Sequence, residues 1–236
     1  MHTDVIELKD FYATPLGAVV RRLLGDRIRA RWGAAPGCTV AGLGFATPYL
    51  GLFREDALRI GAFMPAGQGA LVWPAAGAKL SVLVEEDCLP LPDNSVDRLL
   101  VAHCLEVAER GRPLLRELWR VLAPEGRMIL IAPNRRGLWA RFDTTPFGQG
   151  RPFSRGQLDR LLRNALFAPL EWGYALHLPP FDRPIVLRSA MAWERLGARL
   201  SPAFAGVIMV EASKQLAAPI GKAEVRRFGK LVAVRT

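Results

Sequence analysis

Cysteine and histidine are both scarce in this chain of 236 residues, with three of each. Cys38, Cys88 and Cys104 are widely spaced, so the sequence contains no Cys-x-x-Cys pair and no metal-ligand spacing. We expect all three to be reduced thiols in apolar surroundings. A Ser-His-Asp arrangement is also missing, which argues against hydrolases of that type.

Long hydrophobic runs are absent as well. The longest candidate, residues 203–210, falls far short of the roughly 18 apolar residues that a membrane span needs. The first residues carry acids and lack the basic start and apolar stretch of a signal peptide. These absences predict a soluble, cytoplasmic protein, and half of its residues are hydrophobic, which is enough for one sizeable core.

Lysine is the third scarcity, because only five lysines stand among 32 basic residues. The resulting net charge of +10 raises the question of an anionic partner such as nucleic acid. The arginines are scattered along the whole chain, so genomic composition is an equally open explanation for the excess.

Hydrophobic spacing then indicates the order of the elements. Apolar residues recur at three-and-four spacing over Pro15–Trp32 and predict an amphipathic helix there. Further helices are expected over residues 47–63, 112–122 and 154–166, and strands over residues 38–43, 70–73, 81–84, 98–102, 128–132 and 206–210. Alternating strands and helices predict a parallel sheet covered on both faces.

Two adjoining segments carry a specific family resemblance. The stretch LPLPDNSVDRLLVAHCLEVAE, followed by LLRELWRVLAPEGRMILIAPN, resembles the small-molecule type of class I S-adenosylmethionine-dependent methyltransferases. In that family Asp97 would open the fourth strand, and Pro124 to Gly126 would form the turn before the fifth. The resemblance spans about residues 38 to 170 and implies a doubly wound, seven-stranded, mostly parallel sheet. We expect one domain, with an N-terminal helical lid (1–37), an α/β core (38–212) and a basic tail (213–236).

The resemblance also implies the cofactor S-adenosylmethionine, but its glycine-rich loop is eroded here. The family has an acid that binds the cofactor's ammonium where this chain has Gly42, and glycines where it has Ala46 and Pro48. Only Gly44 matches. That loop would hold the amino-acid end of the cofactor through its backbone.

Two further cofactor positions follow from the same comparison. The acid that holds the ribose hydroxyls is replaced by Trp73, which could stack on adenine or simply pack in the core. Between Trp73 and Ser81 there is no room for an ordinary crossover helix. Glu85, Glu86 and Asp87 all compete for the adenine amino group, and plain solvated charge is the alternative for them.

Candidate catalytic and acceptor-binding residues flank this pocket. His103 and Glu106 follow the fourth strand and could act as bases, with His103 also near the cofactor, although a lone histidine is more often structural. Tyr12 lies in the lid region, where core anchoring is equally open. Four arginines after the fifth strand could bind an anionic group of the acceptor or belong to an ordinary exposed loop; they are Arg135, Arg136, Arg151 and Arg155.

Two functions remain open at this stage. The first is a methyltransferase acting on a small molecule or RNA, although the sequence lacks the Asn-Pro-Pro-aromatic segment of exocyclic-amine DNA methyltransferases. The second is a catalytically degenerate relative that serves as a binding or regulatory protein, with nucleic acid as one candidate ligand. The missing carboxylates and the positive charge favour the second, and the strong match downstream of the glycine-rich loop favours the first.

Overall fold

A central sheet of seven strands organises the chain in the computed structural model, which describes residues 4–200 and 204–216. The strands lie in the order β3-β2-β1-β4-β5-β7-β6. Their bounds are β1 Thr39–Gly44, β2 Arg59–Pro65, β3 Ser81–Val84, β4 Val96–Ala102, β5 Leu122–Pro133, β6 Phe167–Ala175 and β7 Val207–Lys214. Neighbours from β3 to β5 pair in parallel, whereas β7 runs antiparallel to β5 and β6. The expected doubly wound, mostly parallel α/β fold is therefore confirmed.

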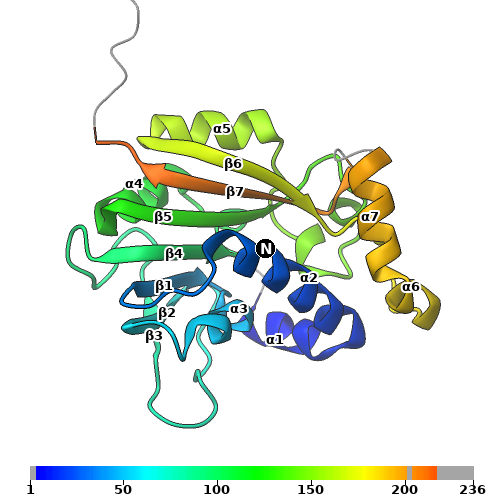
Figure 1. Cartoon of the computed structure of the whole chain (residues 1–236), viewed down its shortest axis with the longest axis horizontal. Helices are drawn as coiled ribbons and strands as arrows, with labels where there is room; N and C mark the ends of the chain where they lie inside the picture. Colours follow the sequence, from blue (N-terminus) through cyan, green and yellow to red (C-terminus); the bar gives the residue numbers. More distant parts are fainter. Residues whose placement is uncertain (1–3, 201–203, 217–236) are drawn as a thin grey trace, which may run out of the picture.

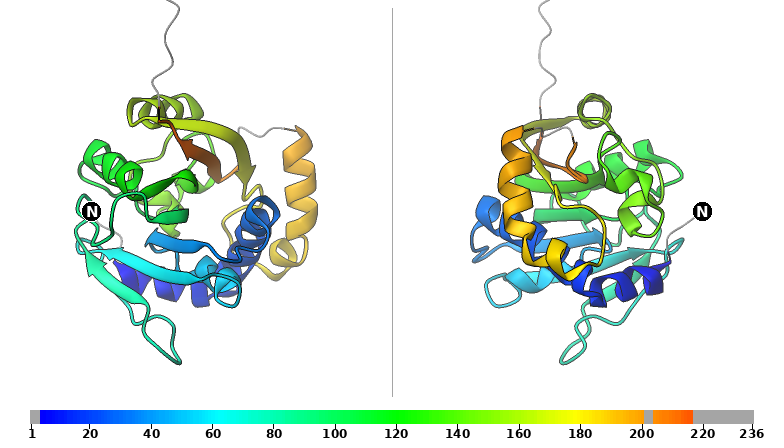
Figure 2. Two further views of the ribbon diagram at one scale, coloured as in Figure 1. Left: turned by 60° about the vertical axis from the view of Figure 1, so that its left-hand side comes forward. Right: turned by 90° about the vertical axis from the view of Figure 1, so that its right-hand side faces the viewer.

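Helices cover both faces of this sheet (Figures 1 and 2). On one face lie α1 Val5–Ala13, α2 Pro15–Trp32, α3 Thr47–Leu50, α6 Pro184–Arg188 and α7 Ala190–Leu200; on the other lie α4 Gly111–Val121 and α5 Arg155–Asn164. Three short 3-10 turns complete the described elements: η1 Gly51–Phe53, η2 Trp139–Arg141 and η3 Pro146–Gly148. The two faces thus enclose two separate apolar clusters with the sheet between them.

The helix predicted from the Pro15–Trp32 spacing is present with the same bounds. Thr14 caps its start by accepting a hydrogen bond from the backbone N–H of Gly17, and Pro15 occupies its first turn. Gly33 ends it with a positive φ of 62°. Leu24 and Ile28 are fully buried on its inner side, which matches the expected amphipathic pattern.

The segment between residues 47 and 80 differs from the sequence prediction. The helix expected over residues 47–63 ends at Leu50 and is followed by the 3-10 turn η1, and its last residues, 59–63, belong to strand β2. The strand expected at residues 70–73 does not exist. Those residues belong to the long connection between β2 and β3, which projects below the sheet in Figure 1 and contains no helix. The prediction that no crossover helix precedes Ser81 agrees with the structure, but the strand before this connection is β2 and not residues 70–73.

Smaller differences occur elsewhere. The turn expected at Pro124–Gly126 is an irregularity within β5, where the register to β4 shifts between Val96 and Arg98. Of the three thiols only Cys104 is buried, and Cys88 is exposed, so the expectation of three core cysteines is wrong for Cys88. All three are free thiols. Most of the expected basic tail (213–236) lies outside the described residues, and β7 includes its first two.

Candidate active site

The end of β1 packs tightly against the end of β4 at the carboxyl edge of the sheet. Gly44 has a φ of 79°, and a Cβ there would lie 2.2 Å from the Ala102 carbonyl oxygen. A Cβ at Gly42 would lie 2.7 Å from Leu50 Cδ1. Both positions require glycine for close packing. Ala46 is also buried, so the glycine-rich loop is enclosed by the protein's own atoms.

Tyr12 of α1 reaches over this loop and closes it. Its hydroxyl lies 2.7 Å from the Tyr49 hydroxyl and 2.8 Å from His103 Nε2. Its ring centroid is 5.7 Å from those of both Phe45 and His103. Tyr12 therefore spans from the loop after β1 to the residue after β4, and burial raises the pKa of its hydroxyl well above the ordinary value. We call the buried side chains of Tyr12, Phe45, Tyr49, His103 and Phe147 the aromatic plug.

His103 occupies the first position after β4 in a left-handed conformation, with a φ of 51°. The Phe147 ring lies 4.6 Å from the imidazole, centroid to centroid, and the Gln68 amide donates to the His103 carbonyl at 2.5 Å. Burial lowers the pKa of the imidazole to about 3, so the ring is neutral at physiological pH. A neutral imidazole can accept or donate one proton within the plug.

Glu106 is buried behind His103. Its Oε1 lies 3.6 Å from His103 Nδ1, which is longer than a hydrogen bond, and its Oε2 has no partner among the described residues. Burial raises the pKa of this carboxyl to about 7. The two predicted bases are thus brought together, but both are shielded from solvent by the plug and by their own loop.

A second feature lies at the ends of β2 and β3, where a cavity of about 210 Å³ opens to solvent. It is lined by Pro65, Ala66, Gly67, Gln68, Glu85, Glu86, Asp87, Val107, Glu109 and Arg110. Asp87 forms an ion pair with Arg110 at 2.7 Å, and partial burial raises the pKa of the Glu86 carboxyl. We call this feature the acidic cavity. It unites all three acids expected near the adenine.

Trp73 does not take part in either feature, which corrects its predicted place at a strand end. Its backbone N–H donates to Ser81 Oγ at 2.9 Å in the connection between β2 and β3. Its side chain is half-buried against the apolar cluster on the α1–α3 face. The residue that ends β2 is Pro65, so no carboxylate occupies that position either.

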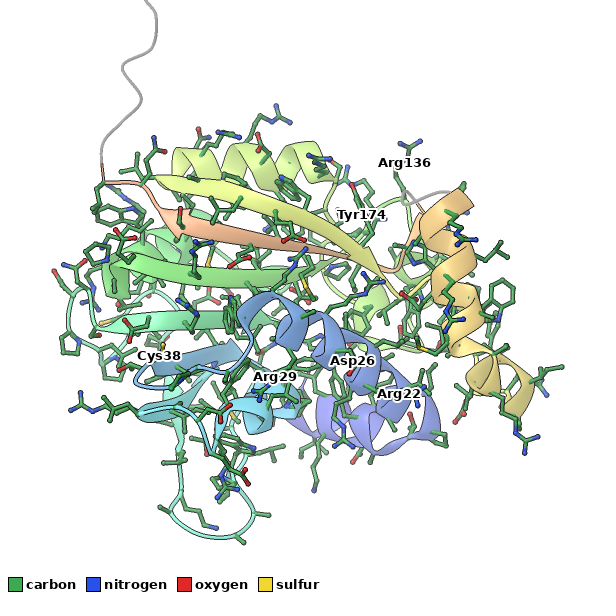
Figure 3. All side chains as sticks on the ribbon, in the orientation of Figure 1. Arg22, Asp26, Arg29, Cys38, Arg136 and Tyr174 are labelled. Atoms are coloured by element: carbon green, nitrogen blue, oxygen red, sulfur yellow. The ribbon has the colours of Figure 1, made fainter. Side chains whose placement is uncertain are left out.

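Only two of the four predicted arginines lie together. Arg135 and Arg151 line one cavity beside the start of α4. Arg136 points away from the body of the protein (Figure 3), and the Arg155 guanidinium carbon lies 5.1 Å from the Trp172 ring centroid. The structure therefore does not bring the four together.

Sequence reasoning missed four residues of the site, namely Phe45, Tyr49, Gln68 and Phe147. Gln68 is only 5% exposed and connects the turn after β2 to His103. Its signal was hidden because β2 was assigned to the wrong segment. No group of side chains in the described ranges, 4–200 and 204–216, could hold a metal ion.

Comparisons with known proteins place this geometry. The family model described as "Methyltransferase domain" matches residues 70–130. An S-adenosylmethionine-dependent methyltransferase from Archaeoglobus fulgidus is 16% identical, with a TM-score of 0.58 over 82% of this chain and 94% of that chain. A second, from Thermotoga maritima, is also 16% identical, with a TM-score of 0.57 over 89% and 96%. The chain therefore matches the methyltransferase family over residues 70–130 and shares the fold of these methyltransferases.

A third similar structure holds a ligand. The 1,6-didemethyltoxoflavin-N1-methyltransferase from Burkholderia thailandensis, solved with S-adenosylhomocysteine, is 17% identical, with a TM-score of 0.52 over 85% of this chain and 78% of that chain. The family match over residues 70–130 agrees with S-adenosylmethionine, the cofactor expected from the sequence. A search of curated proteins finds no significant match. No helix among the described residues is long and apolar enough to cross a membrane.

The two ends of the site differ in how well they fit this cofactor. The acidic cavity offers carboxylates and an open mouth, which suit the hydroxyls and amino group of an adenosine. The loop that would hold the amino-acid end is filled by Tyr12, and Gly42 stands where the family has the acid that binds the ammonium. The adenosine end fits as it stands, and the amino-acid end does not fit while Tyr12 occupies it.

Proposed function

We propose that this protein is an S-adenosylmethionine-dependent methyltransferase that acts on a small-molecule or RNA acceptor. The observation that carries the proposal is the acidic cavity, because it lies where the β2 and β3 ends of this fold are expected to receive the adenosine. The fold and the match over residues 70–130 support the same activity.

Cofactor binding would require Tyr12 to leave the aromatic plug. The residue lies on α1, a helix of nine residues held to the turn after β2 by the hydrogen bond from Val5 N to the Gln68 carbonyl. Displacing α1 would expose Gly44, Tyr49 and His103 together. The cofactor's binding free energy would then be reduced by the cost of opening the plug.

His103 and Glu106 would lie nearest the acceptor once the plug opens. A neutral His103 could accept a proton from an acceptor, and its Nδ1 would face Glu106. Methyl transfer from a sulfonium depends chiefly on alignment of nucleophile and methyl group, so we assign these residues to orientation first and to base catalysis second.

Calorimetry tests the proposal directly. Titration with S-adenosylhomocysteine at high protein concentration should give measurable heat, and millimolar ligand should raise the melting temperature. The proposal is refuted if the titration gives no heat and millimolar ligand does not raise the melting temperature.

A second candidate is a methyltransferase-fold protein that binds ligands without catalysis. The filled glycine-rich loop specifically favours it, since buried hydrogen bonds among Tyr12, Tyr49 and His103 stabilise the closed form. Opening the plug by substitution distinguishes the two. A catalyst should gain cofactor affinity when Tyr12 is truncated, whereas a protein that has lost the site should not.

A further inference from the structure

A basic trough runs along the α4–α5 face, away from the aromatic plug. It consists of two cavities of about 460 and 650 Å³, which share Arg112, Leu161 and Asn164. The first extends to the loop after β5, and the second extends between the two helices toward Leu166. Together they are larger than a site for one small anion needs.

Arginine dominates the lining of the trough. Five arginines contribute to it, namely Arg112, Arg116, Arg135, Arg151 and Arg160. All five are exposed, and none has an ion-pair partner among the described residues. Among the residues that the structure describes, Glu109 is the one acid that lines either cavity.

Other arginines on these helices, or next to them, form ion pairs. Arg110 pairs with Asp87 at 2.7 Å, Arg120 pairs with Glu117 at 2.6 Å, and Arg163 pairs with Asp159 at 2.9 Å. The acids of this face therefore neutralise arginines outside the trough. The positive charges of the arginines inside the trough are therefore not neutralised by these acids and are available to bind an anionic ligand.

The start of α4 adds to this positive potential. Gly111 and Arg112, in the first turn of α4, line the trough, and the N-cap residue Arg110 provides no side-chain cap. Gln157, in the first turn of α5, lines it as well. The start of α5 is closed by the capping box of Ser154 and Gln157, so the free backbone N–H groups that attract anions are those at the start of α4.

The floor of the trough is apolar. Leu166 is 45% exposed, and Leu161 and Trp119 are half-buried beside it. One face of the Trp119 ring is covered by Lys214 Nζ at 4.0 Å, and its indole N–H donates to the Leu166 carbonyl at 3.0 Å. These two contacts hold the Trp119 ring of the floor in place.

We propose that this trough binds single-stranded RNA, with the arginines on successive phosphates and the bases against the apolar floor. Guanidinium groups bind phosphate oxygens in a bidentate manner and also stack on planar bases. An acidic peptide could satisfy the charges, but it would leave the apolar floor without a planar partner. The net charge of +10 would draw a polyanion from a distance. This binding does not depend on methyl transfer.

The test is fluorescence anisotropy with a labelled decauridylate, without cofactor, over a salt series. The variant R112A/R151A/R160A removes three trough arginines, and R183A/R188A/R195A removes the same charge from the exposed α6–α7 side. We expect at least a tenfold loss of affinity for the first variant only. Its salt slope should fall by about 2, since each single-strand phosphate contact contributes roughly 0.7. Both variants should keep the wild-type melting temperature.

Three results would overturn the proposal. Equal weakening in both variants would show attraction by net charge alone. Tighter binding of a labelled decaglutamate than of decauridylate would assign the trough to acidic peptides. No binding of decauridylate at 50 mM salt would leave the trough without an RNA function, whatever the outcome of the cofactor titration.

Discussion

The aromatic plug and the acidic cavity lie side by side at the carboxyl edge of one sheet, yet they are built in opposite ways. The plug is dry and internally hydrogen-bonded, with Tyr12 satisfied by Tyr49 and His103. The acidic cavity is open to solvent and is lined by carboxylates, of which Asp87 forms an ion pair with Arg110. Gln68 belongs to both features, because it lines the cavity and its side-chain amide donates a hydrogen bond to the His103 carbonyl of the plug. The acidic cavity is thus accessible as it stands, whereas the plug must be displaced before any ligand can reach the glycine-rich loop.

Truncation of the plug should have the largest effect. Tyr12→Ala removes a buried ring and leaves Tyr49 and His103 without their shared partner, so we expect the free energy of unfolding to fall by about 3–5 kcal/mol. The same change should strengthen S-adenosylhomocysteine binding at least tenfold, because the site no longer has to be opened. Urea unfolding and calorimetry measure the two effects.

Trp32→Ala is the matched control for that experiment. Trp32 is 7% exposed and packs against Phe53, away from the plug. This substitution should lower the free energy of unfolding by a similar amount without strengthening S-adenosylhomocysteine binding. Equal ligand affinity in the two variants would mean that Tyr12 does not control access.

The pH dependence of stability should expose the buried carboxyl of the plug. The pKa of Glu106 is raised to about 7 from an ordinary value of 4.5, so its contribution is fully present below pH 4.5 and is lost as pH rises through 7. Glu106→Gln should therefore be more stable than the wild type at pH 8, by about 3 kcal/mol, and equal to it near pH 4. Urea unfolding at both pH values measures this.

His103 changes stability in the opposite sense. Burial lowers its pKa to about 3, so its contribution is present above pH 6.5 and is lost as pH falls toward 3. Comparing Glu106→Gln with the wild type at each pH cancels the His103 effect. The exposed Glu125→Gln serves as control, and an equal gain at pH 8 in that variant would contradict a buried, penalised Glu106.

The sequence predicted the half of the fold that has strong local signals. Residues 96–133 combine a long buried strand, an amphipathic helix and a second strand, and each was recognised. Strand β2 was missed because a strand buried on both faces lacks alternation, and its apolar residues continued the spacing of the helical turn before it. Its pairing with β1 is a tertiary effect that local propensity does not report.

The candidate site was predictable in its residues more than in its arrangement. Both bases, the three acids and Tyr12 were selected from the sequence, and all lie at the carboxyl edge. The hydrogen bond between Tyr12 and His103 joins residues 91 positions apart, and no sequence pattern indicates it. The predicted binding roles remain predictions, since they depend on a ligand.

Substitution of Gln68, which connects the acidic cavity to the aromatic plug, should lower stability by an intermediate amount. Gln68→Met keeps the volume of the side chain but removes the amide that donates to the buried His103 carbonyl. An unpaired buried carbonyl costs about 1–3 kcal/mol, which sets the expected loss in thermal or urea unfolding. Gln68→Glu, which also lacks the donor, should lose at least as much. Wild-type stability in Gln68→Met would show that the two ends are not coupled through this residue.

The smallest effect is expected in the acidic cavity, where three carboxylates share one role. Asp87 is engaged by Arg110, and Glu85 is exposed, whereas Glu86 is half-buried at the mouth with a raised pKa. We therefore expect Glu86→Gln to weaken S-adenosylhomocysteine about threefold to tenfold, since one charged hydrogen bond at a partly exposed site is replaced by a neutral one. Glu85→Gln should change affinity less than twofold, and neither variant should alter the melting temperature of the free protein.

Because the plug limits binding, the loss of affinity is best measured in the Tyr12→Ala background, where affinity is highest. If Glu85→Gln and Glu86→Gln weaken binding equally, the carboxylates act only through their summed field, and the acidic cavity does not position the adenosine.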